Sequence, residues 1–553
     1  MSRLEIASPK RAKIVMEGLY KDLERRIESS PPGLCPVDMA RAFLELCHAQ
    51  TCGKCVPCRI GLGQLNNFIR EVLDGKATMK TLDIMEQTAL SIMESADCAI
   101  GYEAANMVYK GLIGYRDDYI EHIQNGRCTC TYNQPVPCVS LCPAHVDIPG
   151  YVALVGEGRY ADAIRLLRKD NPFPTTCGFI CEHPCEARCR RNMVDDSINI
   201  RGLKRVAADF AGEVDPPKCA PDTGKKIAIL GGGPGGLSAA YYLQLMGHQT
   251  TVYEMLPKLG GMLRYGIPNY RLPKDRLDDD IRAILKTGVQ VKNGLKIGQD
   301  ITIQQLRQEY DVVLITIGAS TDKKLGLENE DADGILSAVQ FLRNVGKNQI
   351  MDLTGKEVAV IGGGNVSMDA VRTAKRLGAK KVSIVYRRRV ADMTALPGEI
   401  DGAVAEGIEL QTLKAPSSID VDENHHVKGI YVTPQMVSSI RDGRASIKPT
   451  GEEDIYIPCD VLIVAIGQNI ETHHFEQAGI PVERGKIVTK STGAFENLPG
   501  VFAGGDCASG PASVIKAIAA AKVVAANIDE YLGYHHEISC DVEIPEAHLD
   551  DRT

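Results

Sequence analysis

The pattern of apolar and polar positions changes near residue 216 and divides the chain into two halves. Before this point, apolar residues recur at helical spacing in stretches such as residues 10–28 and 62–73. After it, short β-rich runs alternate with helical stretches and glycine-rich turns, which is typical of a doubly wound α/β fold. The Pro216-Pro217 pair marks the boundary between the halves.

Within the second half, residues 225–236 (KKIAILGGGPGG) and 356–369 (KEVAVIGGGNVSMD) are similar to each other. Each is an apolar strand followed by a glycine-rich turn and the start of a helix. Such a unit brings backbone N–H groups at the helix N-terminus close to a pyrophosphate. We therefore expect two dinucleotide-binding units in this half.

The first unit carries the complete glycine pattern. Gly231, Gly233 and Gly236 fit G-x-G-x-x-G after an apolar strand, and an alanine-rich helix follows. The next strand ends at Glu254, the expected place for a carboxylate that accepts hydrogen bonds from an adenosine ribose. A purely structural glycine turn is the alternative.

The second unit carries a shorter form of the pattern. Gly362, Gly364 and Ser367 stand at the corresponding positions, and Asn365 follows the second glycine. We expect these four residues to hold the second dinucleotide.

Arginines follow the next strand of the second unit, in the run Tyr386-Arg387-Arg388-Arg389. The register places Arg387 where Glu254 stands in the first unit. Replacing an acid by arginines removes repulsion and adds a bidentate partner for a 2′-phosphate, which selects NADP over NAD. We expect Arg387 and Arg388 to discriminate between these cofactors; a solvated basic strand end is the alternative.

Composition limits the class of protein. The 553 residues are 44% hydrophobic and 24% charged, which is ordinary for a globular protein of three or four domains. The net charge of −8 argues against a nucleic-acid-binding surface. No apolar run reaches the roughly 18–20 residues that span a bilayer, and the N-terminus lacks a signal-peptide core. We expect a soluble, cytoplasmic protein without membrane insertion.

Cysteine is in excess: 14 of the 18 cysteines lie before residue 190. Clustered cysteines in a cytosolic protein point to metal or redox chemistry. Cys52, Cys55 and Cys58 form C-x2-C-x2-C, and Cys98 follows after 39 intervening residues. Three thiolates on one tight loop with a fourth from a distant helix suit a [4Fe–4S] cluster. Tetrahedral zinc is the alternative, although zinc sites more often use two spaced pairs.

A second group of cysteines lies within residues 128–189. Cys142 precedes a proline and closes a C-x3-C-P run that is ferredoxin-like in form. Eight cysteines over 62 residues can hold two clusters. The members of the group are Cys128, Cys130, Cys138, Cys142, Cys177, Cys181, Cys185 and Cys189.

The second half resembles the two-dinucleotide-binding-domain flavoproteins. Residues 500–506 (GVFAGGD) are a short strand that runs into Gly505 and Asp506, and in that family the late G-D motif binds the ribityl and pyrophosphate of FAD. Residues 259–268 (LGGMLRYGIP), which include Gly261, resemble the family's flavin-contacting stretch; a simple loop is the alternative. The resemblance implies FAD in the first unit.

The cysteine-rich half resembles two known modules. Residues 30–115 are similar to the C-terminal iron–sulfur domain of the NADH-binding subunit of respiratory complex I, which uses the corresponding four cysteines as ligands. The motifs from CVSLCPAHVDIPGYV to INIRGLKRVAADFAGE resemble the small subunit of NADPH-dependent glutamate synthase. They equally resemble the large subunit of ferredoxin-dependent NADH:NADP transhydrogenase and the N-terminal half of dihydropyrimidine dehydrogenase. That module, about residues 120–545 here, implies two [4Fe–4S] clusters, FAD and NADPH.

The resemblance also implies ligands. The first cluster would use Cys128, Cys130, Cys138 and Cys189. The second would use Cys142, Cys181, Cys185 and the side chain at the position of Lys204. This chain departs from the family, because one residue instead of two separates Cys128 from Cys130, and because Lys204 replaces a Gln or Glu although an ammonium cannot ligate iron. Three clusters are therefore expected in all, and for one of them either substitution by Cys177 or an altered cluster stays open.

These patterns predict helical iron–sulfur domains followed by an α/β, Rossmann-like flavoprotein with two dinucleotide-binding domains. The expected boundaries are residues 1–115 and 116–215 for the iron–sulfur domains, 216–350 with 455–553 for the FAD-binding domain, and 351–454 for the NADP(H)-binding domain. No residue need act as a nucleophile, because the protein binds and orients cofactors that carry the chemistry.

The expected function is that of an NADP(H)-dependent oxidoreductase subunit that passes electrons between NADP(H), FAD and the clusters. The complex-I-like domain implies partner redox subunits, such as ferredoxin or a flavin- and NADH-binding subunit. The resemblance extends to electron-bifurcating transhydrogenase, hydrogenase and formate dehydrogenase complexes. The alternatives are the NADPH-oxidising small subunit of a glutamate synthase and a structural scaffold with degenerate clusters.

Overall fold

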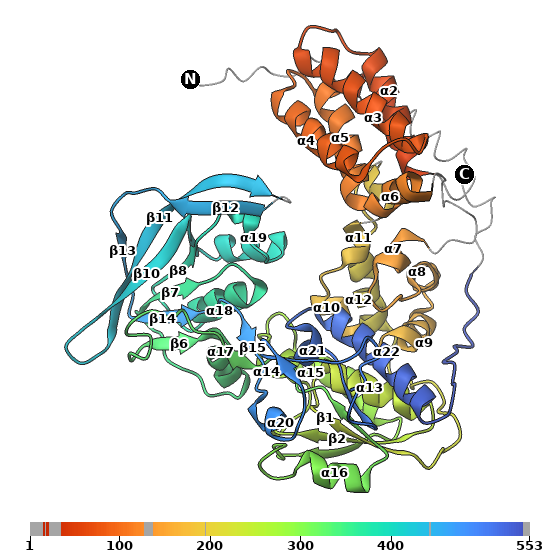
Figure 1. Ribbon diagram of the computed structural model, residues 1–553, viewed down its shortest axis with the longest axis vertical. Coiled ribbons are helices and arrows are strands. Elements are labelled where there is room, and N and C mark those ends of the chain that lie inside the picture. Colours follow the sequence, from red (N-terminus) through yellow and green to blue (C-terminus); the bar gives the residue numbers. More distant parts are fainter. Residues whose placement is uncertain are drawn as a thin grey trace. The chain divides into compact units, whose positions relative to one another are not determined.

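The computed structural model describes residues 15–16, 18–21, 35–125, 136–187, 189–193, 195–441 and 444–545 (Figure 1). The chain forms two compact units. The first comprises residues 1–148 and 183–200, and the second comprises residues 149–182 and 201–553.

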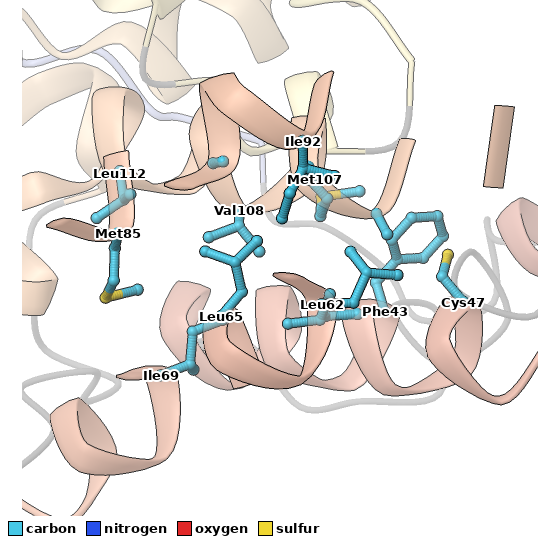
Figure 2. Close-up of a cluster of buried hydrophobic side chains, with 14 of the residues drawn as sticks. Phe43, Cys47, Leu62, Leu65, Ile69, Met85, Ile92, Met107, Val108 and Leu112 are labelled. Atoms are coloured by element: carbon cyan, nitrogen blue, oxygen red, sulfur yellow. The ribbon is translucent and has the colours of Figure 1, made fainter. Parts of the chain in front are cut away.

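The first unit is helical, and its core is built from the amphipathic faces of α2 to α6 (Figure 1). Phe43, Leu62, Leu65, Val108 and Leu112 are fully buried in this core, and Figure 2 shows their side chains pointing toward one another. The helices of the unit are α2 (Pro36–Ala49), the π-helical turn η1 (Pro57–Gly61), α3 (Leu62–Leu73), α4 (Met79–Ser95), α5 (Ala99–Gly114), α6 (Arg116–Asn125), α7 (Pro137–Leu141), α11 (Pro184–Ala187) and the 3-10 turn η2 (Arg190–Met193).

The second unit contains a first parallel sheet with the strand order β18-β4-β1-β2-β3. Helix α13 packs on this sheet and against α22, and both helices bury small and apolar residues. The elements are β1 (Lys226–Leu230), α13 (Pro234–Leu245), β2 (Gln249–Glu254), α14 (Met262–Tyr265), α15 (Lys274–Leu285), β3 (Gln290–Asn293), α16 (Ile303–Glu309), β4 (Val312–Ile315), β18 (Val501–Ala503), α21 (Asp506–Ser509) and α22 (Val514–Tyr531).

A second parallel sheet has the order β6-β14-β7-β8-β9, and an antiparallel sheet of four strands is inserted between β9 and β14. The parallel sheet and its helices are β6 (Ile335–Ser337), α17 (Ala338–Gly346), β7 (Glu357–Ile361), α18 (Asn365–Arg376), β8 (Lys381–Tyr386), the 3-10 turn η3 (Val390–Asp392), α19 (Pro397–Ala405), β9 (Glu409–Thr412) and β14 (Val461–Val464). The inserted strands are β10 (Lys414–Val421), β11 (Val427–Arg441), β12 (Arg444–Pro449) and β13 (Ile455–Pro458). Short elements complete this part: β5 (Thr321–Asp322), β15 (Gln468–Asn469), α20 (His473–Gln477), β16 (Val482–Glu483) and β17 (Lys486–Ile487).

Four helices precede the first sheet: α8 (Ile148–Gly156), α9 (Tyr160–Asp170), α10 (Pro174–Ile180) and α12 (Ile200–Phe210). Helix α10 is joined to α15 through Asp280, a fully buried carboxylate. Asp280 accepts hydrogen bonds from the backbone N–H groups of Thr175 (3.3 Å) and Thr176 (2.7 Å). Two otherwise unpaired donors of the first turn of α10 are thereby satisfied.

No helix in the described part of the chain combines the length and the apolar character needed to cross a membrane.

Candidate cofactor sites and iron–sulfur centre

The turn between β1 and α13 is built from glycines because any side chain would collide with backbone. Gly231 has φ = +112°, and a Cβ there would lie 2.6 Å from the carbonyl oxygen of Thr316. A Cβ on Gly236 would meet the carbonyl oxygen of Gly231. Gly236 therefore packs the helix under the turn, while the N-terminus of α13 stays open to a phosphate group.

Glu254 ends β2 beside this turn and is 5% exposed. Its two carboxylate oxygens accept hydrogen bonds from the N–H groups of Gly232 and Leu256, each at 2.8 Å. Burial raises the pKa of Glu254, and the backbone hydrogen bonds oppose that effect. These bonds fix the carboxylate, and each oxygen keeps lone-pair capacity for a ribose hydroxyl.

The late G-D segment enters the same site from the other end of the chain. Gly505 has φ = +74° and Asp506 begins α21 directly after it. Burial raises the pKa of Asp506 to about 6. Gly261, just before α14, also has a positive φ. A Cβ there would lie 2.8 Å from the Cα of Gly233, so the loop before α14 touches the turn before α13 at these glycines.

These predicted residues surround one pocket, although they come from four separate segments. The pocket is lined by Gly231, Gly233, Glu254, Gly261, Gly505 and Asp506. Gly236 does not line the pocket; it packs α13 against the turn that does. Its glycine cradle and its two acids, Glu254 and Asp506, fit the pocket to a dinucleotide such as FAD.

Sequence reasoning missed the apolar end of this site. Met255, Leu295, Ile297 and Phe475 line an adjoining pocket that shares Gly231 and Glu254 with the first. These side chains provide the apolar surroundings that a planar base requires. Only the alternation of apolar residues around Leu295 could have drawn attention to them, and ordinary core packing produces the same pattern.

The second turn has the same construction. Gly362 has φ = +143°, and a Cβ there would collide with the carbonyl of Ala465 and lie 2.5 Å from Oγ of Ser367. Ser367 is fully buried, and its Oγ donates to the carbonyl of Ala465 at 3.5 Å. Ser367 therefore packs the helix against the strand, while Gly364 and Asn365 form the open start of α18.

The strand register corrects one prediction. Leu230 pairs with Tyr253 in the first α/β part, and Ile361 pairs with Val385 in the second α/β part, so Tyr386 stands at the position of Glu254. The prediction that Arg387 occupies this position is wrong by one residue. β8 ends at Tyr386 as β2 ends at Glu254, so these two residues are equivalent. The Tyr386 ring lies beside the second turn, 2.7 Å from the place of a Cβ on Gly363.

The three arginines after β8 differ in what they contact. Arg389 forms an ion pair with Asp392 at 2.9 Å and holds the pKa of that carboxyl well below its usual range. Arg388 donates from Nε to the carbonyl of Ala445 at 3.0 Å, which leaves its two terminal nitrogens to bind an anion. Arg387 is exposed, and no hydrogen bond or ion pair joins it to another described residue. Two guanidinium groups can therefore bind an anion here.

A further pocket connects the two turns. Met262, Leu263 and Asp506 border it from the first α/β part, and Asn365 and Asp369 border it from α18. Asp506 and Met262 also line the dinucleotide pocket described above. Two cofactors bound at the two turns would thus open on one shared space.

Buried charges hold the two α/β parts together beside that space. Arg271, 11% exposed, forms ion pairs with Asp369 (2.7 Å) and Glu399 (3.1 Å). Glu182 accepts a hydrogen bond from the side-chain amide of Asn365 at 3.2 Å. Removing one partner from such a buried network leaves an uncompensated charge, so the network fixes this arrangement.

The first cysteine group lies together in the helical unit. Cys52 is exposed, Cys55 and Cys98 are half-buried, and Cys58 is buried on η1. Burial raises the pKa of the Cys58 thiol to about 12, with contributions from Cys55, Cys98 and Cys52. Four thiols this close ionise together only when a cation holds them, which is the donor set of an iron–sulfur cluster.

A glycine leaves space beside these sulfurs. Gly101 lies in the first turn of α5, and a Cβ there would sit 2.6 Å from Sγ of Cys58. Cys98 caps the same helix. The residues present therefore fit a bound cluster on both donor chemistry and space.

The second cysteine group is described in part. In the first unit, α7 packs against α11, and burial raises the pKa of Cys138 to about 11, with contributions from Cys189 and Cys142. Cys185 is buried on α11. The predicted ligands Cys128 and Cys130 lie outside the described residues.

In the second unit, Cys177 and Cys181 are buried, and Lys204 is 6% exposed with its Nζ 5.8 Å from the centre of the Tyr151 ring. Burial raises the pKa of Cys177; the neighbouring Cys181 adds to the effect and the Lys204 ammonium opposes it. The described residues of this unit therefore place an ammonium near Cys177.

Comparison with known families agrees with this architecture. The profile described as pyridine nucleotide-disulphide oxidoreductase matches residues 225–521, more than half of the chain. This chain belongs to the pyridine nucleotide-disulphide oxidoreductase family. Two further profiles match before it: the NADH-ubiquinone oxidoreductase-F iron-sulfur binding region over residues 38–122, and dihydropyrimidine dehydrogenase domain II, 4Fe-4S cluster, over residues 114–215.

Curated relatives share this combination. The NADP(+)-dependent formate dehydrogenase subunit beta of Moorella thermoacetica is 32% identical, over 89% of this chain and 79% of the relative. The NADPH-Fe(3+) oxidoreductase subunit beta of Geobacter sulfurreducens is 34% identical, over 91% and 79%. The glutamate synthase [NADPH] small chain of Escherichia coli is 33% identical, over 71% of this chain and 88% of the relative.

These findings confirm the predicted fold class, helical iron–sulfur regions followed by a dinucleotide-binding flavoprotein. The chain is an NADP(H)-dependent oxidoreductase with an FAD- and NADP-binding region and two regions of the 4Fe–4S type.

Proposed function

We propose that this family member is the NADP(H)-oxidoreducing subunit of a larger redox complex, in which electrons pass between NADP(H), FAD and [4Fe–4S] clusters. The observation that carries the proposal is the pocket shared by the two glycine turns, which Asp506 and Asn365 border from opposite sides. When bound, FAD supplies exchange of electron pairs with a nicotinamide and of single electrons with a cluster. The chain's own residues bind and orient the cofactors.

The residue roles belong to this proposal. Glu254 would bind the ribose of FAD, and Asp506 its polyol. Arg387 and Arg388 would bind a 2′-phosphate, while Gly364 and Asn365 would hold the pyrophosphate at the start of α18. Arg271 would keep α18 in place through Asp369.

Ligand assignments are also proposed. Cys52, Cys55, Cys58 and Cys98 would hold one cluster. The second group would hold two more, with the ligands that the family resemblance implies and with an open ligand at Lys204.

Partner redox subunits follow from the relatives, since two of them are named as beta subunits of a formate dehydrogenase and of an iron(III) oxidoreductase. We place the protein in the cytoplasm because ligand cysteines must stay reduced. Supply of electrons to a glutamate synthase is the second candidate, favoured by the small-chain relative. The iron–sulfur region at residues 38–122 favours the larger redox complex, because such a region normally passes electrons to further redox subunits.

The first test is iron and flavin quantitation on anaerobically purified protein, followed by stopped-flow reduction with NADPH and NADH. We expect about twelve irons, four per cluster, and one FAD per chain, with rapid bleaching by NADPH. About eight irons would remove one cluster from the proposal, and flavin without iron would contradict it.

Two variants locate the first cluster within that count. Gly101→Ala places a methyl against the Cys58 sulfur and should lower the iron content by about four per chain. Gly63→Ala is the matched control, because the nearest atom around its added Cβ, Cε1 of His48, is 4.0 Å away. Equal iron in the two variants would exclude a cluster at Cys58.

A further inference from the structure

Three side chains of the kind that bind metals lie close together near the C-terminal end of α13, away from its open N-terminus. His248 precedes β2, Asp529 lies on α22, and His536 lies in the segment after it. Their ligand atoms all lie within 4.8 Å of one another. Nε2 of His248 is 2.9 Å and Nδ1 of His536 is 2.8 Å from the same oxygen, Oδ1 of Asp529. His248 and Asp529 are buried.

The groups behind His248 orient its ring. Oγ1 of Thr223 lies 2.7 Å from Nδ1 of His248, donates to the carbonyl of Gly247 at 3.1 Å, and accepts from the N–H of Lys225 at 3.3 Å. Oγ1 of Thr223 thus lies within hydrogen-bond distance of one ring nitrogen of His248, and the other ring nitrogen, Nε2, faces the Asp529 carboxylate. A metal-bound histidine takes this arrangement, with one ring nitrogen toward the metal site and the other held by a hydrogen-bonding group.

The Asp529 carboxylate is oriented toward both imidazole rings. Neutral imidazole is a metal ligand. Oδ2 of Asp529 accepts the backbone N–H of His536 at 2.7 Å, which orients Oδ1 toward both rings.

We propose that His248, Asp529 and His536 form a binding site for Zn²⁺ that fastens the C-terminal segment to the FAD-binding part. Two imidazoles and a carboxylate are a donor set that zinc prefers, with water as fourth ligand. Zinc–ligand bonds of about 2.0–2.1 Å in tetrahedral geometry need ligand atoms separated by about 3.3 Å, so the present contacts open by about 0.5 Å. The site is independent of the iron–sulfur clusters and the shared cofactor pocket.

The test measures zinc on the intact, cofactor-loaded protein after addition of one equivalent of ZnSO₄ and dialysis. Wild type should retain about one zinc per chain. Its X-ray absorption at the zinc edge should show nitrogen and oxygen ligands with imidazole scattering, and no sulfur at about 2.3 Å. No retained zinc, or a shell of sulfur ligands, would overturn the proposal.

Variants separate this site from the many cysteines. His536→Ala, in the half-buried segment after α22, should lose the retained zinc, whereas His535→Ala, at the exposed neighbouring position, should keep it. Thr223→Val, which preserves the ligands but removes the hydrogen-bonding partner of Nδ1, should weaken zinc binding about 10- to 100-fold. If His536→Ala retains as much zinc as wild type, the three residues are a hydrogen-bonded cluster only.

Discussion

The three arginines after β8 show how much the surroundings of a side chain decide its role. Arg389 is neutralised by Asp392, and Arg388 donates one of its N–H groups to backbone. Arg387, exposed at the end of the run, has its full guanidinium available. The positive charge that a 2′-phosphate would meet therefore comes from two residues of the three. In the sequence all three look equivalent.

At this scale we expect Arg387→Ala combined with Arg388→Ala to raise the KM for NADPH about 10- to 100-fold, since each charge-assisted hydrogen bond contributes about 1.5–3 kcal/mol. The KM for NADH should change little. Steady-state kinetics with both cofactors measure this difference. Lys380→Ala, at the opposite end of β8, is the control. Equal effects on NADPH and NADH would show that the arginines do not read the 2′-phosphate.

At the scale of elements, the two strand–turn–helix units are held by the same physical device. In each unit, a glycine at the start of the turn allows close contact with the residue that follows another strand of the same sheet. Gly231 lies against Thr316 after β4, and Gly362 lies against Ala465 after β14. The third motif position differs, because Gly236 allows backbone contact and Ser367 fills the corresponding space with its hydroxyl. The motif therefore describes helix–strand packing as much as ligand contact.

Gly236→Ala should consequently disrupt the first turn. The added methyl would meet the carbonyl of Gly231, so either the turn or α13 must move. We expect FAD affinity to fall at least about 10-fold and the unfolding free energy to fall by about 1–3 kcal/mol. Flavin content after desalting measures the first, and chemical denaturation the second. Gly398→Ala in α19, where nothing lies within 4 Å, should retain wild-type flavin.

At the scale of the whole molecule, buried carboxylates join segments that are distant in the chain. Asp280 on α15 anchors α10, and Asp369 on α18 anchors Arg271. Burial raises the pKa of each of these two acids to about 6. Burial opposes the ionisation of both carboxyl groups, so the stability of the contacts that they make depends on pH.

This dependence can be measured at Asp280. The folded pKa of about 6 exceeds the ordinary value of about 3.9, so the folded protein binds a proton that the unfolded chain releases between these values. The contribution to the unfolding free energy is largest below pH 4 and decreases as the pH rises through about 6. Between pH 5 and pH 7.5 we expect wild type to lose about 1–2 kcal/mol relative to Asp280→Asn.

Urea denaturation at the two pH values, monitored by flavin fluorescence, measures this difference in unfolding free energy. Asp275→Asn, an exposed position on the same helix, should follow the wild-type pH profile. A pH-independent offset between wild type and Asp280→Asn would show that Asp280 keeps one ionisation state across this range.

Much of the architecture could be predicted because its signals are local. The glycine turns extend over about a dozen residues each, and their strands and helices follow from the same segments. The C-x2-C-x2-C loop likewise brings three cysteines close together through chain connectivity alone. Glu254 ends β2, as its pattern predicted. The register prediction for Arg387 was wrong, because the pairing between strands decides which residues are equivalent.

The sequence by itself determined the class of chemistry through two dinucleotide turns and clustered cysteines. Tertiary structure alone decided which charges remain available and which distant groups meet. His248 and Asp529 are 281 residues apart, and Arg271 and Asp369 are 98 apart, yet each pair is in hydrogen-bond contact. Such contacts depend on how separate helices and sheets pack, and no local spacing along a chain records that packing.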